Sequence, residues 1–439
     1  GANALSVTTS GVENVAIGKD ALAANTTADA NTAVGFAALT ANTTGTRNTA
    51  VGRRALVANT TGNDNDAFGR HALEANTTGS QNVAIGRAAL ASNTTADGNT
   101  AVGYSALIGN TTGASNVAIG EDALAANTTA STNTAVGYQA GQSNTTGAIT
   151  AFGSNALSAN TTGNYSHAFG ESALRSNTTG QSNVAVGGSA LRTNTTGDRN
   201  IGIGDSSLRA VTTADNNTAV GHHSGENMTT GYQNTLFGSE AGHGLTTGYG
   251  NTFVGRDSGY FTTTGSLNTF VGVNSCGQEV TTGSKNTIIG RYNGNQHGLD
   301  IRTSSNNIVL SDGDGNPRMN FDSSKLHWTL EDGVSFGKLK SHLVNVNSTT
   351  TTLNFSSLGS SQSETGFYLV SVCREGGSVG THGIFLVAVS TSSSIIIYDT
   401  IVKSANLTAS VSGANFQVQA TGTIVHTTAI PIGINGGSI

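Results

Sequence analysis

Side chains that could do chemistry are few and scattered in this chain. Lys and Arg total 20 and Asp and Glu total 26 among 439 residues. The segment Asp312-x-Asp314-x-Asn316 has the alternating oxygens with which a calcium-binding loop begins. Pro317 and Ser323 stand where such a loop needs glycine and glutamate. We therefore expect a polar hairpin turn here and no bound metal.

A second candidate is the histidine pair His222 and His223. Imidazoles grouped around a threefold axis can hold a transition metal. Adjacent residues of a strand face opposite sides, however, and variable positions of a repeat are usually on the surface. We expect two surface histidines, no metal site and no cofactor.

Glycoside hydrolysis is the enzymatic chemistry we considered, and it needs two carboxylates about 5–10 Å apart across a cleft. Most acidic residues occupy variable positions and are interpreted as a solvated face: Asp20, Glu74, Glu121, Glu171, Asp205 and Asp257. Near the C-terminus, Glu364, Glu375 and Asp399 are too few to favour an active site. We expect no enzyme. A depolymerase site formed between chains stays open as a lesser alternative.

Composition excludes further classes of protein. Only 10% of residues are charged, the net charge is −6 and no basic block is present, so nucleic-acid binding is not expected. Cys276 and Cys373 lie far apart in regions of different character, which argues against a disulfide framework or a thiolate metal site. No apolar run approaches the ~18 residues needed to span a bilayer.

The element that must position all these side chains is a repeat with the consensus NTAVGxxALxxNTTGxx. Its first glycine recurs from Gly18 to Gly290 with a 17-residue period, in which one step is shorter and one step is longer by a single residue. This period is too short for helical-hairpin repeats or propeller blades. Glycine and Asn-Thr-Thr-Gly leave room for two short extended stretches per period. The repeat therefore predicts a parallel β-solenoid, or β-roll, with coils stacked ~4.8 Å apart.

Stacked coils place equivalent side chains above one another. The first asparagine of the repeat is predicted to form an amide ladder with these members: Asn31, Asn48, Asn82, Asn99 and Asn116. Asn-Thr-Thr also matches a glycosylation sequon, and regular threonine pairs occur in ice-binding solenoids. The strict period favours ladder packing over glycosylation, and the threonines adjoin a corner glycine instead of lying within a flat strand. The repeated glycine indicates a positive φ or a close approach.

Apolar pairs in the repeat indicate burial on both faces of a strand. Ala33 and Val34, like Ala84 and Ile85, are neighbours that point to opposite sides. One face can line the coil, whereas the other needs a partner. We therefore predict parallel association of several chains, with three as the expected number.

Beyond the repeats the pattern changes to longer strands. Residues 299–337 contain a hairpin signal and are interpreted as a neck. Residues 338–439 hold seven or eight runs rich in β-branched and aromatic residues, typical of an antiparallel β-sandwich or jelly roll. The predicted fold is all-β: a trimeric β-roll shaft of 17 coils over residues 1–298, the neck, and a sandwich tip.

These NTAVGxxAL and NTTG arrays resemble the head repeats of trimeric autotransporter adhesins and, more closely, the arrays of bacteriophage tail fibres. The segment SSNNIVLSDGDGNPR at 304–318 is similar to the segment that comes after such arrays in those fibres. The resemblance implies a homotrimer of interlocked left-handed β-rolls, extracellular and part of a virion tail. It also implies attachment to other tail proteins through a region upstream of Gly1.

The function expected on these grounds is that of a tail fibre, a receptor-binding protein whose tip adsorbs to a host surface polysaccharide or outer-membrane component. Three weak tip sites engaged together would raise affinity by avidity. Candidate receptor contacts are polar and aromatic residues at loops or strand ends: Arg374, Glu375, His382, Tyr398 and Asn406. The main alternative is a bacterial cell-surface adhesin whose shaft itself binds. A tailspike depolymerase is the lesser one.

Overall fold

The computed structural model describes residues 1–276, 280–296 and 298–322, and the backbone of the later strands. Contacts divide the chain into two units, described separately: Gly1–Lys285 with Asp300–Ser305, and Asn286–Leu299 with Asn306–Ile439. The described elements are all strands, which confirms the all-β prediction. None of the described residues forms a helix long and apolar enough to cross a membrane.

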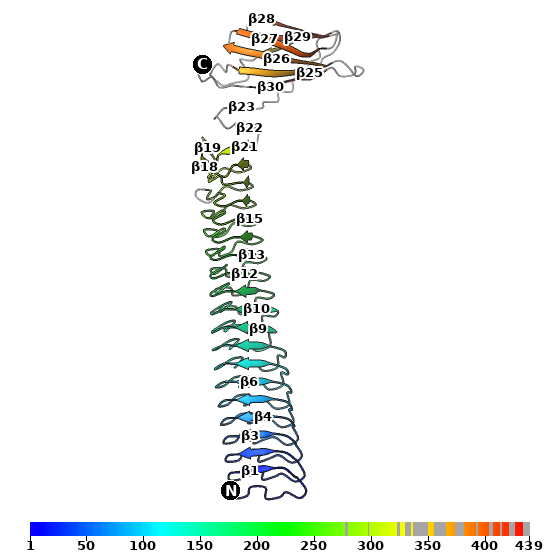
Figure 1. Ribbon diagram of the computed structural model, residues 1–439, viewed down its shortest axis with the longest axis vertical. Coiled ribbons are helices and arrows are strands. Elements are labelled where there is room, and N and C mark those ends of the chain that lie inside the picture. Colours follow the sequence, from blue (N-terminus) through cyan, green and yellow to red (C-terminus); the bar gives the residue numbers. More distant parts are fainter. Residues whose placement is uncertain are drawn as a thin grey trace. The chain divides into compact units, whose positions relative to one another are not determined.

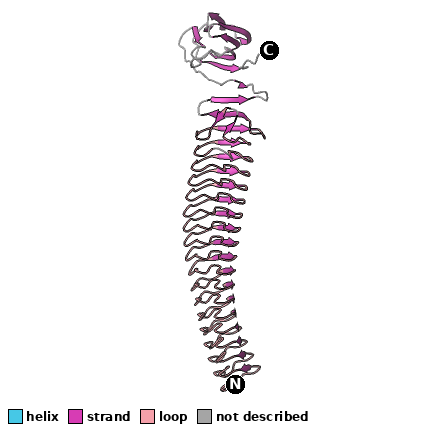
Figure 2. Ribbon diagram, turned by 90° about the vertical axis from the view of Figure 1, so that its left-hand side faces the viewer, coloured by secondary structure: helices cyan, strands magenta, loops and turns pink. Residues whose placement is uncertain are grey.

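The first unit contains one short strand in each coil, and the strands stack on one side of the solenoid (Figures 1 and 2). Their bounds are β1 (Val15–Ile17), β2 (Thr32–Val34), β3 (Thr49–Val51), β4 (Asp66–Phe68), β5 (Val83–Ile85), β6 (Thr100–Val102), β7 (Val117–Ile119), β8 (Thr134–Val136), β9 (Ile149–Phe152), β10 (Ser166–Phe169), β11 (Val184–Val186), β12 (Ile201–Ile203), β13 (Thr218–Val220), β14 (Thr235–Phe237), β15 (Thr252–Val254) and β16 (Thr269–Val271).

Neighbouring coils pair in parallel with a register of one repeat. Ala33 of β2 lies opposite Ala50 of β3, the equivalent residue of the next coil. At the short step, Ala135 of β8 lies opposite Ala151 of β9, although the chain between them is one residue shorter than a full repeat. The missing residue is absorbed in the turn, because the strands on either side keep their register. A parallel solenoid of 17-residue coils is thus confirmed.

The interior of each coil is thin and partly polar. In the second coil the fully buried side chains are Asn31, Ala33, Ala38, Leu39 and Asn42. Only the middle residue of the strand points inward, and its neighbours Thr32 and Val34 are partly exposed. A core of two alanines, one leucine and two asparagines per coil explains how a chain with 36% hydrophobic residues folds at all.

The prediction of two extended stretches per coil is wrong for the second stretch. Ala37 and Leu39 have φ values of 55° and 50°, in the left-handed region that β-strands exclude. Positive φ values recur at the equivalent positions of the other coils along the solenoid. This side still bonds coil to coil, since the Leu39 N–H donates to the Ala55 carbonyl at 3.0 Å. It is a hydrogen-bonded stack of turns, not a sheet.

The glycine that follows each strand is required for two reasons. Gly103 has a φ of 137°, a conformation that L side chains rarely adopt. A Cβ at this position would also lie 2.6 Å from the carbonyl oxygen of Gly120 in the next coil. Backbones of successive coils therefore approach each other too closely here for any side chain.

Later coils exchange volume between two core positions. Gly225, Gly242 and Gly259 occupy the slot that holds leucine in earlier coils, all with a φ of 63°. The strand alanine becomes larger in the same region, and Leu236 and Phe253 fill the space above these glycines. Phe253 and Phe270 stack with ring centroids 4.8 Å apart. Close packing is thus kept while the residues that provide it change.

The second unit is assembled mostly from antiparallel strands. Their bounds are β17 (Thr287–Ile289), β18 (Asn295–Gln296), β19 (Leu299–Asp300), β20 (Ile308–Ser311), β21 (Pro317–Asp322), β22 (Lys325–Thr329), β23 (Ser335–Phe336), β24 (Thr350–Asn354), β25 (Gly366–Cys373), β26 (His382–Thr391), β27 (Ser394–Lys403), β28 (Leu407–Ser412), β29 (Asn415–Ala420) and β30 (His426–Ile432).

Pairing in this unit begins with β17 beside β20 in parallel, and β20 to β23 continue as antiparallel neighbours. Two further antiparallel sheets follow, one of three strands in the order β24-β29-β28 and one of four in the order β27-β26-β25-β30. The side-chain packing that would make these sheets a sandwich lies outside the described residues.

Substitution of the strand-following glycine should damage one coil. For Gly103→Ala we expect a loss of about 1–3 kcal/mol from backbone strain alone, together with faster hydrogen exchange in β6 and β7. Gly98→Ala is the matched control, because Gly98 also has a positive φ but only Ser115 Oγ, at 3.7 Å, lies near its Cβ position. Hydrogen–deuterium exchange over residues 95–120 separates the two, and equal protection in both variants would contradict this account.

Candidate interaction surface

The outward face of the β1–β16 stack carries an unbroken apolar row. We call the last residue of each of these strands, immediately before its glycine, the outer row. Its members are Ile17, Val34, Val51, Phe68, Ile85, Val102, Ile119, Val136, Phe152, Phe169, Val186, Ile203, Val220, Phe237, Val254 and Val271. Every one is valine, isoleucine or phenylalanine, so no charge interrupts the row.

In the single chain these side chains are exposed or partly exposed. The exposed fraction reaches 59% at Ile17 and 57% at Phe237, and it is 38% at Phe152. Neighbours in the row touch along the axis, as Phe152 and Phe169 do with ring centroids 5.3 Å apart. A contiguous exposed apolar surface of this kind indicates an interaction site.

Aromatic residues on the far side of the glycine widen this surface. Phe36, Tyr104 and Tyr138 each follow the strand glycine and are 45–47% exposed. Lys19 lies 6.0 Å from the centroid of the Phe36 ring, and the Arg87 guanidinium lies 5.4 Å from that of Tyr104. These two charged residues beside the row therefore lie over aromatic rings, as in a cation–π contact.

Behind this face lies the asparagine ladder that holds the turns together. Asn48 donates from Nδ2 and from its backbone N–H to Asn31 Oδ1, at 3.2 and 3.0 Å. The bonds repeat where Asn99 meets Asn82, at 2.9 Å for the backbone and 3.3 Å for the side chain. Asn116 donates to Asn99 Oδ1 at 3.1 Å. All five of the predicted ladder residues are fully buried.

A second ladder runs through the asparagine of Asn-Thr-Thr-Gly, where the strict period favoured ladder packing over glycosylation. Asn59 Nδ2 donates to Asn42 Oδ1 at 2.8 Å, and Asn76 continues the chain of bonds at 2.9 Å. The carbonyl of Gly62 accepts from Asn59 at 3.0 Å and from Asn48 of the first ladder at 2.8 Å. Each turn is therefore tied to both ladders through one carbonyl.

The second ladder ends at Asn194. The next coils place Val211, Met228 and Leu245 in the same slot, all fully buried. The Oδ1 atom of Asn194 accordingly has no hydrogen-bond partner in the described part of the chain. The strict period of Asn-Thr-Thr in the sequence signalled this ladder, and the loss of asparagine from the slot after Asn194 signalled its end.

Burial decides between packing and glycosylation at the Asn-Thr-Thr sequons. The asparagine side chain that a glycan would modify is fully buried, as at Asn76 and Asn93. The first threonine hydroxyl is also committed, since Thr60 Oγ1 donates to the Thr77 carbonyl at 3.0 Å. Both residue types serve the packing of coil on coil in this structure.

The receptor contacts predicted in the C-terminal part are placed only partly. His382 begins β26 and Tyr398 lies within β27. Arg374, Glu375 and Asn406 lie outside the described residues. Backbone register sets His382 opposite Cys373, which in turn lies opposite His426.

The loop considered for calcium is a polar turn. Asp312 Oδ1 accepts from the backbone N–H groups of Asp314 and Asn316 at 3.0 and 2.8 Å. Its Oδ2 accepts from Asn316 Nδ2 at 3.0 Å and from Arg318 at 2.7 Å. Hydrogen bonding by Asn316, assisted by Arg318, lowers the pKa of the Asp312 carboxyl to about 2. Both carboxylate oxygens are thus committed to the turn between β20 and β21.

Comparison with known proteins adds no family. No protein-family model, curated protein or solved structure matches the chain.

The Asp312 turn should respond to acid. Because the folded pKa is below the ordinary value of 3.8, the stabilisation is present above that value and is lost as the pH falls towards about 2. Hydrogen exchange of residues 308–321, normalised to intrinsic rates at about pH 5 and about pH 2.5, should show weaker protection at the lower pH, where part of the stabilisation is lost. Asp312→Asn should be poorly protected at both, and wild-type protection in the variant at the higher pH would refute the role given to the carboxylate.

Proposed function

We propose that this protein is a self-associating fibre in which several copies pack through the outer row. The observation that supports this most directly is the uninterrupted exposed apolar row. Its burial would remove from water about sixteen valine, isoleucine and phenylalanine side chains per chain, each worth roughly 1.5–3 kcal/mol when fully buried. Only part of this burial free energy is gained on association, because the side chains of the row are already partly buried in the single chain.

The partner that fits this row best is another copy of the same chain. Covering it requires an equally long apolar surface with the same spacing between coils, because the row repeats with every strand pairing. A second copy in parallel has that spacing because its coils are the same. Association around a rotation axis also gives a closed oligomer, in which every row is buried and none is left to bind further chains.

Three copies are the proposed number. The row is one side chain wide and is flanked by the partly exposed first strand residues such as Thr100 and Thr134. Around a threefold axis, each row can face the other two while the flanking threonines stay near solvent. The resemblance of the repeats to trimeric fibres points to the same number.

The biological role proposed for the trimer is that of a bacteriophage tail fibre. The solenoid would serve as the shaft, and the strands beyond residue 338 would adsorb to a host surface polysaccharide or outer-membrane component. The supporting features are the repeat resemblance and the change from short parallel strands to two antiparallel sheets. A bacterial cell-surface adhesin with a binding shaft is the second candidate, favoured by the aromatic residues exposed beside the row. We propose no enzymatic activity.

Charges placed in the outer row should prevent association. A variant with five lysines in the row should be monomeric with unchanged circular dichroism, whereas the wild type should have three times the chain mass by mass photometry. The substitutions are Ile85→Lys, Ile119→Lys, Val136→Lys, Phe169→Lys and Val186→Lys.

The control places the same five charges in the same coils but outside the row. Each control residue precedes its counterpart by four positions and is exposed: Gln81, Ser115, Thr132, Tyr165 and Ser182. Lys285 already occupies the equivalent left-handed position, with a φ of 58°. The control variant should remain trimeric. A monomeric wild type, or equal masses for the two lysine variants, would refute the proposed interface.

Adsorption should reside in the C-terminal part. Labelled full chain is tested by flow cytometry on a panel of bacterial strains, and residues 338–439 fused to a trimeric coiled coil compete for the bound strain. We expect this fusion to block binding and residues 1–298 to leave it unchanged. The reverse result would support the adhesin, and loss of surface polysaccharide during incubation would support a depolymerase.

A further inference from the structure

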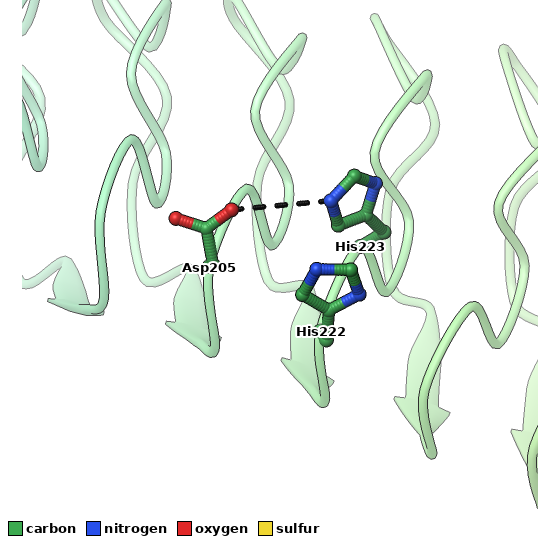
Figure 3. A group of neighbouring side chains, drawn as sticks. All are labelled: Asp205, His222 and His223. Carbon is green, nitrogen blue, oxygen red and sulfur yellow. Dashed lines mark ion pairs between the residues drawn. The ribbon is translucent and has the colours of Figure 1, made fainter.

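Three coils in the second half of the solenoid bring together an unusual set of side chains. Numbered from the strand glycine, His223 is at position two and Glu226 at position five of the coil that follows β13. His243 is at position five of the next coil, so it stacks directly on Glu226. Asp205 and Arg209 come from the preceding coil. Figure 3 shows Asp205 beside the consecutive histidines His222 and His223.

Two imidazoles converge on one carboxylate oxygen. His223 Nδ1 lies 2.6 Å and His243 Nε2 lies 3.3 Å from Glu226 Oε2. The Glu226 side chain is only 10% exposed, while those of His223 and His243 are 31% and 24% exposed. The three ligand atoms lie within 4.8 Å of one another. The group is therefore anchored in the structure but can be reached from solvent.

The remaining atoms of these three side chains are also engaged. Arg209 holds Glu226 Oε1 at 3.0 Å, which leaves Oε2 for the histidines. Asp205 Oδ2 lies 3.9 Å from His223 Nε2, the ion pair drawn as a dashed line in Figure 3.

His243 is positioned by two other neighbours. Its Nδ1 lies 3.5 Å from Asn227 Nδ2, and its ring stacks on Tyr260 with centroids 4.7 Å apart. Secondary contacts of this kind orient the first ligands of metal sites.

We propose that His223, Glu226 and His243 bind a divalent transition-metal ion of the zinc class. Imidazole nitrogen and carboxylate oxygen are preferred zinc ligands, with bonds of about 2.0–2.2 Å, so ligand atoms of a tetrahedral site lie roughly 3.4 Å apart. The His243–Glu226 separation already matches this distance. His223 and Glu226 would move apart by about 0.8 Å as the metal replaces the bond between them. The fourth position is open to solvent.

His222 is not part of the proposed site. Its ring centroid lies 3.8 Å from that of His223, so the expectation that these neighbours face opposite sides is wrong. Both follow Gly221, beyond the end of β13, where strand alternation no longer applies. His222 groups with Asp205 and His223, whereas the proposed ligands form the other group, His223, Glu226 and His243.

The chain contains its own control for this site. His71 and Glu74 occupy the same two positions of an earlier coil, with Nδ1 and Oε2 2.7 Å apart and Arg54 on the other carboxylate oxygen at 2.7 Å. The residue that corresponds to His243 is Ala91. A histidine–glutamate–arginine group therefore occurs twice, and only one copy has the second imidazole.

Zinc titration of the full chain tests the proposal. By isothermal calorimetry we expect about one zinc per chain in the wild type and in His71→Ala and His222→Ala, and none at this site in His243→Ala or His223→Ala. Asp205→Asn should weaken binding roughly 10–100-fold, as loss of a group that orients a ligand does. Hydrogen exchange across residues 218–243 in zinc-free samples shows whether each variant keeps the coil structure.

Cobalt provides an independent spectroscopic measurement. The wild type should show the visible absorption of a four-coordinate ion with nitrogen and oxygen ligands, and His243→Gln should lack it while keeping the side-chain volume. The proposal is overturned if the wild type binds no more zinc than His243→Ala, or if His222→Ala or His71→Ala abolishes binding. It does not depend on self-association, because all three ligands belong to one chain.

Discussion

Each coil of the solenoid satisfies its polar backbone through the coil beside it. The Thr32 N–H bonds to the Asn48 carbonyl at 2.8 Å on the strand side, and the Leu39 N–H bonds to the Ala55 carbonyl on the turn side. Such bonds require successive backbones to approach closely all the way around. Glycine after the strand, glycine in the Asn-Thr-Thr-Gly turn and the left-handed residues between them are consequences of that requirement. The low share of large apolar residues follows, because hydrogen bonds and amide ladders supply much of the order.

This constraint also separates inside from outside. In a three-residue strand one inward residue leaves the other two facing outward, and in every coil from β1 to β16 the last strand residue is apolar although it is exposed or partly exposed. Side chains beside it differ in type from coil to coil without interrupting it, as the cations Lys19 and Arg53 on either side of the Phe36 ring show. One surface thus carries two kinds of position side by side: the outer row, which stays apolar, and its neighbours, which vary from coil to coil. An interface next to a solvent-exposed face would have this pattern.

Sequence reasoning predicted the features that depend on the period. The 17-residue spacing was enough for the parallel stack, its register and the ladder position of Asn48. It did not predict the conformation of Ala37 and Leu39, because alanine and leucine carry no local signal for a positive φ. Tertiary bonding imposes that conformation against their preference.

The cluster around Glu226 was missed for a different reason. Its members extend along the sequence from Asp205 to His243 and come together only when the chain is written in columns of one repeat. Taken as neighbours, His222 and His223 suggested alternate faces of a strand. When the repeats are aligned in columns, Glu226 and His243 occupy the same column in successive coils. Contacts in this protein follow column position more than distance along the chain.

The one short coil shows what the stack tolerates. At the step from β8 to β9 a residue is missing from the turn, Ile149 takes the asparagine slot, and its N–H still bonds Asn133 Oδ1 at 2.6 Å. The next coil places Ser166 in that slot and the ladder resumes at Asn183. Because every coil presents the same bonding edge to its neighbour, recombination between any two repeats in a gene would join edges that already match. Length could then change by whole coils during evolution while the registers on both sides of the junction persist.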